Sequence, residues 1–446
     1  MRSTFAIVMG SVIVAAACAD GADSPRVTAP PAVSRTTALL GSGAFQFTPL
    51  DESAVCTVSG GDPDAPFLVP TGYTQSIVAS EPAFADAPDM NTVNETGPQA
   101  GRFLYRPSEG SVGEVTVTDL VTGQTKLIAA RSDWEGMDPI VWTPWGTLLV
   151  GEETNAQQRP DPDYPNAVGG LMYEIFLHQG DPTVADSVVA RPALGAKAHE
   201  GTRFDSQGNL YGISERNPGY IFKFVPDHPA NLATGQLYAL QIVSATGDRT
   251  GDAEWIPLDR AAVQIDANAV AQSAGATGYN RPEDVEIATS SGNSRGGADR
   301  LFVAVTGKSG PADNRVLAID LHAPDGGPTH SRATVFDYVR VGVNATAEFE
   351  MPDNLALDHA GNLYVAEDPG GSFATKHKGD DIWVATPPSG GILGPAASVV
   401  RFATLTDCDA EPTGIYFGLR GDTLFVNAQH RGGDHIDKAV AIARDR

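Results

Sequence analysis

Acidic residues recur at the ends of short apolar runs in this sequence. Three of them begin a run: Glu200, Glu283 and Asp353. Others follow or end one: Glu152, Glu153, Glu215, Glu367 and Asp368. Carboxylates that converge with few basic neighbours repel one another, so they must be protonated, solvated or neutralised by cations. Hard oxygen ligands of this kind suit Ca²⁺.

Two further side chains could contact a substrate. Arg281 lies two residues before Glu283, and its guanidinium could hold a phosphate oxygen in a bidentate contact. It could instead form a structural ion pair with Glu283 or Asp284. His430 could be a proton donor, a metal ligand or a hydrogen-bonding residue. We take Arg281 and His430 as candidate catalytic residues, and favour a structural role for His199.

Several other chemistries lack their usual motifs. The sequence has no Gly-x-Ser-x-Gly elbow and no Walker A run, which argues against serine hydrolases and nucleoside-triphosphate chemistry. It also lacks the His-x-x-x-His and Cys-x-x-Cys spacings that are typical of zinc sites.

A repeated pattern predicts the elements that carry these residues. A turn followed by a β-rich run recurs six times, and each copy is followed by a second apolar run. The copies begin at Gly101, Gly146, Gly208, Asp299, Gly361 and Gly421. Copies about 60 residues apart predict an all-β fold, a six-bladed β-propeller with four-stranded blades. Seven blades are the alternative, because the 91-residue interval after Gly208 could hold another blade.

A third strand precedes several copies and begins with small or polar residues, and in three cases these include the acidic residue Glu200, Glu283 or Asp353. In a hairpin, the start of the first strand and the end of the second lie at the same edge. Radial repetition would bring that edge of every blade round one axis. We therefore expect an acidic mouth on the axis, with these candidate metal ligands: Glu152, Glu153, Glu200, Glu283, Asp353, Glu367 and Asp368. The alternative for any single one is a solvated loop residue.

The charge of the chain limits its partners. Thirty Lys and Arg residues against 55 Asp and Glu residues give a net charge of −25 over 446 residues. A surface this acidic repels nucleic acids and anionic lipids, so we expect neither as a partner. A phosphate-bearing ligand would need a bound cation between it and the protein.

The N-terminus reads as an export signal over residues 1–18. Arg2 precedes an apolar segment, and Ala15-Ala-Ala17 leads to Cys18, a candidate for lipid attachment. Residues 19–66 read as a linker and residues 67–446 as a single propeller domain. We expect an exported monomer, periplasmic or at the cell surface, whose only membrane contact would be a lipid on Cys18.

The other two cysteines are Cys56 and Cys408, near the two ends of the folded part. In an exported chain this arrangement suggests a disulfide. Two unpaired thiols are the alternative.

At these residues the sequence resembles the PhoX family of secreted bacterial alkaline phosphatases. The resemblance rests on residues 142–153, His199-Glu200, Arg281-Pro-Glu283, Pro352-Asp-Asn354 with Glu367-Asp368, and Pro412-Thr-Gly414 with Asn427-Ala-Gln-His430. It implies a six-bladed propeller with calcium and iron at its axis, which hydrolyses phosphomonoesters. It also implies metal ligation by Glu153 or Glu152, Glu283, Asp353 and Asp368, and a phosphate contact by Arg281.

Two features depart from that family. Its iron centre uses a cysteine upstream of the Trp-Gly motif, where this sequence has only Cys18 and Cys56. Its twin-arginine signal is replaced here by a single Arg2. Both departures favour Ca²⁺ as the cofactor over Fe.

Three functions follow from these observations. The first is a metal-dependent phosphoric-ester hydrolase that acts on a small phosphate-bearing substrate outside the cytoplasm. The second is a non-catalytic, calcium-stabilised cell-surface propeller that binds ligands through its loops, because folds are often reused without activity. The third is hydrolysis of another ester or of a lactone. Metal content and turnover of p-nitrophenyl phosphate would separate the first two.

Overall fold

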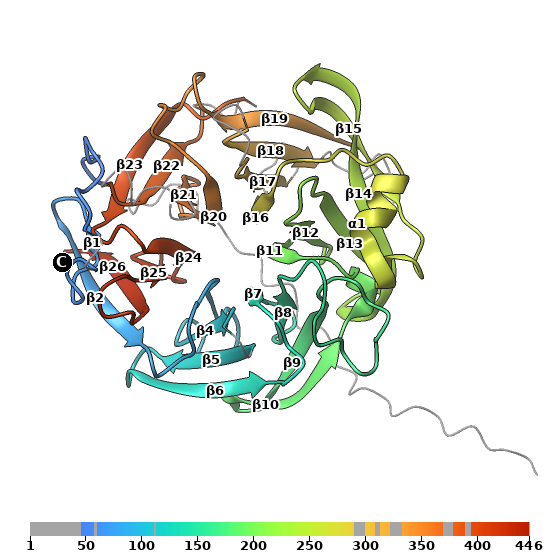
Figure 1. Ribbon diagram of the computed structural model, residues 1–446, viewed down its shortest axis with the longest axis horizontal. Helices are drawn as coiled ribbons and strands as arrows, with labels where there is room; N and C mark the ends of the chain where they lie inside the picture. The colour runs from blue at the N-terminus through green and yellow to red at the C-terminus, as the bar shows by residue number, and fades with distance from the viewer. Residues whose placement is uncertain are drawn as a thin grey trace, which may run out of the picture.

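A computed structural model describes residues 46–57, 60–110, 113–289, 299–307, 313–321, 332–368, 378–388 and 394–445. The described strands form antiparallel sheets arranged as a ring round a central axis (Figure 1). The expected export signal and Cys18 lie outside the described residues. No helix of the described part is long and apolar enough to cross a membrane.

Three four-stranded groups come from the first half of the chain. The first contains β3 (Thr92–Val93), β4 (Phe103–Ser108), β5 (Glu114–Asp119) and β6 (Gln124–Ala130). The second contains β7 (Met137–Trp142), β8 (Leu148–Glu152), β9 (Met172–His178) and β10 (Asp181–Ala190). The third contains β11 (His199–Phe204), β12 (Leu210–Ser214), β13 (Ile221–His228) and β14 (Asn231–Gly247).

The second half of the chain supplies three more. The fourth contains β16 (Pro282–Ala288), β17 (Arg300–Val305), β18 (Arg315–Leu321) and β19 (Arg332–Arg340). The fifth contains β20 (Pro352–Leu357), β21 (Leu363–Glu367), β22 (Asp381–Thr386) and β23 (Ser398–Leu405). The sixth contains β24 (Glu411–Phe417), β25 (Thr423–Gln429), β26 (Lys438–Arg444) and β2 (Tyr73–Ser80).

These groups confirm the prediction of an all-β propeller. Each predicted turn-and-strand copy becomes the second strand of a blade, and the acidic strand before it becomes the inner strand, next to the axis (Figure 1). Many blade strands are buried on both faces because neighbouring blades cover them; β18 is buried along its whole length. Such strands read as continuous apolar runs.

The long interval after Gly208 holds an extension of two blades. The 17-residue β14 pairs with β15 (Thr250–Pro257), and β15 pairs with β19, so the third and fourth groups share one nine-stranded sheet. The 3₁₀ helix η1 (Pro192–Leu194) and the helix α1 (Val263–Ser273) lie against the third group through buried residues such as Leu194 and Ala267. No additional blade is found in the described residues of this interval.

The two ends of the chain close the ring. Strand β2 pairs with β26, and the short β1 (Phe67–Leu68) pairs with β23. Cys56 and Cys408 form a disulfide, which confirms that prediction. Residues before β1 also contact the fifth group, because Phe47 packs edge-on against Phe402. Part of the predicted linker, residues 19–66, therefore packs against the propeller.

Candidate active site

The axial end of the ring carries a cavity of about 270 Å³ that we call the acidic mouth. Twelve carboxylates line it: Asp89, Glu109, Asp138, Glu153, Glu200, Glu215, Glu283, Asp353, Asp368, Asp380, Asp409 and Glu411. Arg281 and His430 line it as well. Among the described lining residues, Arg281 is the one side chain with a permanent positive charge.

The inner strands supply one part of this set at a repeated position. Asp138, Glu200, Glu283 and Asp353 are the second residues of β7, β11, β16 and β20. In each of these strands the pairing with the second strand shifts register just after this position. Such a bulge turns a side chain away from the regular alternation of a strand. It therefore aims the four carboxylates at the axis.

The second strands supply the other part, from the residue that follows each strand. Glu109, Glu153, Glu215, Asp368 and His430 follow β4, β8, β12, β21 and β25. In three blades a backbone hydrogen bond fixes this residue, because its N–H donates to the carbonyl oxygen of the residue that precedes the inner strand. The bonds are Glu153 to Gly136 at 2.7 Å, Glu215 to Ala198 at 3.2 Å and Asp368 to Met351 at 2.9 Å.

Two of the predicted ligands do not line the mouth. Glu152 and Glu367 are the last residues of β8 and β21, one position before Glu153 and Asp368, and successive strand residues point to opposite faces. Glu152 accepts backbone hydrogen bonds from Glu135 and Leu171. Glu367 accepts them from Glu350 and Asp381, and also from the Trp383 indole. Both carboxylates hold their blades together.

Two groups of carboxylates in the mouth have the spacing of metal ligands. Asp89, Asp138 and Glu200 form one group, and Glu109, Asp138 and Glu153 form the other, with ligand oxygens within 4.8 Å of one another. Asp138 belongs to both. Both its oxygens, and Oδ1 of Asp89, are buried and receive no hydrogen bond from an N–H or hydroxyl group of the described residues. Asp138 and Glu200 share a hydrogen bond when one of them carries a proton.

Burial and mutual repulsion govern the ionisation of these carboxylates. Burial, followed by the charges of neighbouring carboxylates, raises the pKa values of Asp89 and Asp138 well above the ordinary range. The same causes raise the pKa of Glu200. Without cations the mouth therefore holds protons, and a cation that replaced them would relieve the repulsion.

Arg281 neutralises the other side of the mouth. Its guanidinium contacts Glu215. It also lies 3.2 Å from the carboxylate of Glu283 and 3.8 Å from that of Asp368. Burial opposes its charge, but these carboxylates outweigh that effect and raise the pKa of Arg281. Its Nη1 atom is buried and has no hydrogen-bond partner among the described residues. That atom is available to an anion.

The backbone at Arg281 is held in a left-handed conformation with φ of 42°. Its N–H donates to Arg216 O at 3.1 Å, and its carbonyl accepts from Thr306 N at 3.0 Å. A non-glycine residue adopts such a φ only where its surroundings impose it, and such sites are common near active centres.

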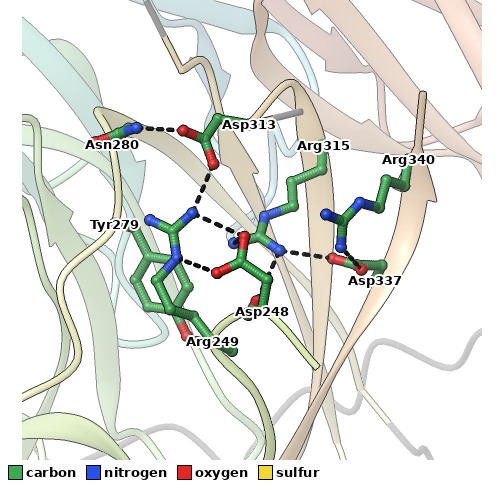
Figure 2. Close-up of polar contacts among 8 residues, drawn as sticks. All are labelled: Asp248, Arg249, Tyr279, Asn280, Asp313, Arg315, Asp337 and Arg340. Atoms are coloured by element: carbon green, nitrogen blue, oxygen red, sulfur yellow. Dashed lines mark hydrogen bonds and ion pairs between the residues drawn. The ribbon is translucent and has the colours of Figure 1, made fainter. Parts of the chain in front are cut away.

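The segment before Arg281 is anchored in a network of paired charges (Figure 2). We call this the arginine network; it consists of Asp248, Arg249, Asp313, Arg315, Asp337 and Arg340. Tyr279 donates its hydroxyl to Arg249 O at 2.9 Å, and the Asn280 amide contacts Asp313. The network therefore connects the turn between β14 and β15 with the fourth blade and with the strand entry that carries Arg281.

The histidines have different surroundings. His430 is 54% exposed and lies 3.9 Å from Glu411 at the rim of the mouth. His199 is buried, and its ring nitrogens contact Gly195 O and Lys197 Nζ at 3.0 and 3.1 Å. Burial, followed by the charge of Lys197, lowers the pKa of His199. A structural role fits its contacts.

Several mouth residues were missed in the sequence, although the same pattern marks them. Asp138 begins the strand before the copy at Gly146, as Glu200 and Glu283 do for theirs. Pro88-Asp89 and Glu411-Pro412 carry an acid beside a proline, as in Pro282-Glu283 and Pro352-Asp353. Extending the pattern to all six copies would have found these three acids.

The sequence matches the family "Alkaline phosphatase PhoX" over residues 142–432, more than half of the chain. The chain belongs to the PhoX family. The match includes the inner-strand acids from Glu200 to Glu411, together with Arg281 and His430. Asp89, Glu109 and Asp138 precede it.

One solved structure supports the fold. Pseudomonas fluorescens PhoX in complex with vanadate, a transition state analogue, is similar with a TM-score of 0.61 and 19% identity. The match covers 86% of this chain and 98% of that chain. A putative oxidoreductase (glucose dehydrogenase) from Thermus thermophilus is similar with a TM-score of 0.45 and 14% identity. That match covers 83% of this chain and 100% of that chain. Among curated proteins, no significant match was found.

Proposed function

We propose that this PhoX-family protein is a calcium-dependent phosphomonoesterase that acts outside the cytoplasm. The observation that carries the proposal is the pair of carboxylate groups that share Asp138, in the same mouth as a guanidinium whose Nη1 atom has no hydrogen-bond partner among the described residues. A phosphate monoester is an anion, so an acidic mouth can bind it only through positive charge. Cations held by the carboxylate groups would supply that charge, together with the guanidinium.

The donor set of the mouth fits Ca²⁺. Carboxylate oxygens are hard ligands, and six to eight of them are usual round Ca²⁺. Asp138, Glu200 and Asp89 would hold one ion, and Asp138, Glu153 and Glu109 a second. Bound calcium would polarise the phosphoryl group and lower the pKa of a bound water.

An iron centre with a thiolate ligand does not fit the described residues. Cys408 lines the mouth, but its sulfur is bonded to Cys56. A disulfide sulfur is not a thiolate, so the family's iron chemistry is left out of the proposal.

The chain's own residues would bind and orient the substrate. Arg281 would donate from Nη1 to a phosphoryl oxygen, and this bond would strengthen as negative charge develops there. Glu215 and Glu283 hold the guanidinium in place, so its orientation is set before the substrate arrives. His430, exposed at the rim, would give a proton to the departing alcohol.

The test measures bound metal and turnover of p-nitrophenyl phosphate on the same sample. We expect calcium in the purified protein, turnover that is lost with a chelator, and recovery when Ca²⁺ is restored. Asp186→Asn, at an exposed carboxylate of β10, is the matched control and should change neither. Bound calcium without turnover would favour the alternative, a non-catalytic surface propeller.

Export, lipid attachment at Cys18 and a monomeric state complete the proposal. The disulfide supports an oxidising compartment. Fractionation of cells that express the full chain, together with the mass of its N-terminal peptide, would test the first two. Sedimentation would test the third.

A further inference from the structure

A second hollow, of about 570 Å³, opens beside the acidic mouth. Glu215 and Arg281 line both, so the two spaces share a wall. Asn268 and Gln272 also line it, and both belong to α1 in the extension between the third and fourth blades. A phosphate held by Arg281 therefore lies next to this hollow.

The walls of this hollow are polar and rich in amides. Four of the eight lining residues are amides: Asn155, Asn217, Asn268 and Gln272. Pro218 is the one apolar residue among the described lining residues, and none of them is aromatic. Each amide offers both a donor and an acceptor. Such walls suit hydroxyl groups and offer little to an alkyl or aryl group.

Asn268 gives the wall of the hollow a hydrogen-bond acceptor to which no described residue donates. Its side chain is only 8% exposed, and Nδ2 donates to Pro218 O at 3.3 Å. This bond leaves Oδ1 as an acceptor, which is buried and has no partner among the described residues. A buried acceptor without a partner is unfavourable. A hydroxyl group in the hollow would satisfy it.

We propose that this hollow is the leaving-group subsite and takes the alcohol of a polyol or sugar phosphate. The proposal rests on the phosphomonoesterase activity proposed above. Hydrolysis forms a P–O bond to water and breaks the P–O bond to the alcohol, which keeps the oxygen and gains a proton. The hollow binds the hydroxyl groups on the rest of that alcohol.

Two substrates with the same carbon skeleton test this inference. Glycerol 3-phosphate and n-propyl phosphate both have three carbons, but only the first has hydroxyl groups on the leaving alcohol. We expect the wild-type protein to have the higher kcat/KM for glycerol 3-phosphate. Asn268→Leu should reduce this preference about tenfold, because the buried acceptor is lost.

Two further variants keep the test decisive. Gln272→Leu changes an exposed lining residue of α1, so it gives the result if Asn268→Leu fails to fold; its preference should fall severalfold. Gln264→Leu is the matched control, because Gln264 lies on α1 and donates to Arg260 O at 3.0 Å, away from the hollow. It should keep the wild-type preference.

The outcomes separate the two proposals. If the wild-type protein hydrolyses both esters and both leucine variants in the hollow keep its preference, the subsite is wrong and the phosphomonoesterase stands. If the wild-type protein has no preference, the subsite is wrong as well. If calcium-loaded protein hydrolyses neither ester, nor p-nitrophenyl phosphate, both proposals fail.

Discussion

The acidic mouth and the arginine network contain the same kinds of side chain in opposite balance. The network has three arginines and three aspartates, and each aspartate lies within 3.0 Å of a guanidinium nitrogen. The mouth has twelve carboxylates and one arginine among its described residues. Paired charges stabilise the fold without further ligands. The carboxylates of the mouth outnumber its one arginine, so they are compatible with a stable fold only when protons or cations neutralise the excess charge.

The buried members of the two regions show the same contrast. Arg315 is fully buried, and its Nη1 atom lies 3.0 Å from Asp337, which also contacts Arg340 at 2.6 Å. Asp138 is also buried, but its carboxylate lies within 4.8 Å of the carboxylate oxygens of both groups described above. Removing the negative charge of an aspartate should therefore destabilise the network and stabilise the metal-free mouth.

The largest expected effect is that of Asp138→Asn. It removes ligand charge from both carboxylate groups, so calcium content should fall and turnover should drop about 10³-fold. In a chelator, however, the variant should melt at a higher temperature than the wild type, because the buried asparagine is neutral without taking up a proton, whereas Asp138 must be protonated on folding. Metal analysis, kinetics and thermal unfolding on one preparation test this. Full calcium content in the variant would contradict the assignment.

Arg281→Ala should have the next largest effect on turnover, a loss of about 10²–10³-fold, as for one preorganised donor to a developing charge. Calcium content should not fall, since the substitution leaves more negative charge in the mouth. Arg281→Lys should recover only part of the activity, because an ammonium lacks the planar fork. In a chelator, Arg281→Ala should lower stability, opposite to Asp138→Asn. Unchanged turnover would make Arg281 a purely structural partner of Glu215 and Glu283.

Within the arginine network, Asp337→Asn should lower the free energy of unfolding by about 2 kcal/mol, because it removes a charged hydrogen-bond partner of the buried Arg315. Among the described residues, Asp248 at 3.7 Å is then the ion-pair partner that Arg315 keeps. The loss should be the same with calcium and with a chelator, and calcium content should not change. Denaturant unfolding under both conditions measures it. A loss seen only with calcium would mean that the network and the metal sites are coupled.

The pH dependence of stability should also separate the two regions. Burial raises the pKa values of Asp138, Glu200 and Asp89, so the folded state holds more protons than the unfolded state above about pH 4. Stability without metal must then fall as the pH rises from 4 towards neutrality. Thermal unfolding in a chelator at several pH values would measure this fall. Saturating Ca²⁺ should abolish it; a flat profile in a chelator would contradict the repulsion.

The ring and most of the mouth could be predicted from the sequence because both repeat. A six-fold pattern of turn, strand and acid specifies which edge of each blade carries the carboxylates. The errors were local: Glu152 and Glu367 differ from Glu153 and Asp368 by one residue, and only the strand register decides which of them faces the axis.

The arginine network and the second hollow could not be predicted in this way. Arg249 pairs with Asp313, 64 residues away, and no repeat connects the two. The hollow depends on α1, which is not part of the repeated pattern. This helix lies in the 91-residue interval after Gly208, for which a seventh blade is the alternative prediction. Features that occur once leave no periodic signal, so they need the three-dimensional structure.

The smallest expected effect is that of Tyr279→Phe, which tests whether the arginine network only supports the mouth or also tunes it. The substitution keeps the ring against which Arg249 packs at 5.5 Å, and removes the hydroxyl that donates to Arg249 O. One neutral hydrogen bond contributes about 1 kcal/mol, so stability should fall by that amount with or without calcium. Because Arg281 is also held by the backbone bonds to Arg216 and Thr306, calcium content and turnover should stay within about twofold of wild type, a change smaller than the loss of one such bond. A tenfold loss of turnover at full calcium content would show instead that the network sets the position of the Arg281 guanidinium.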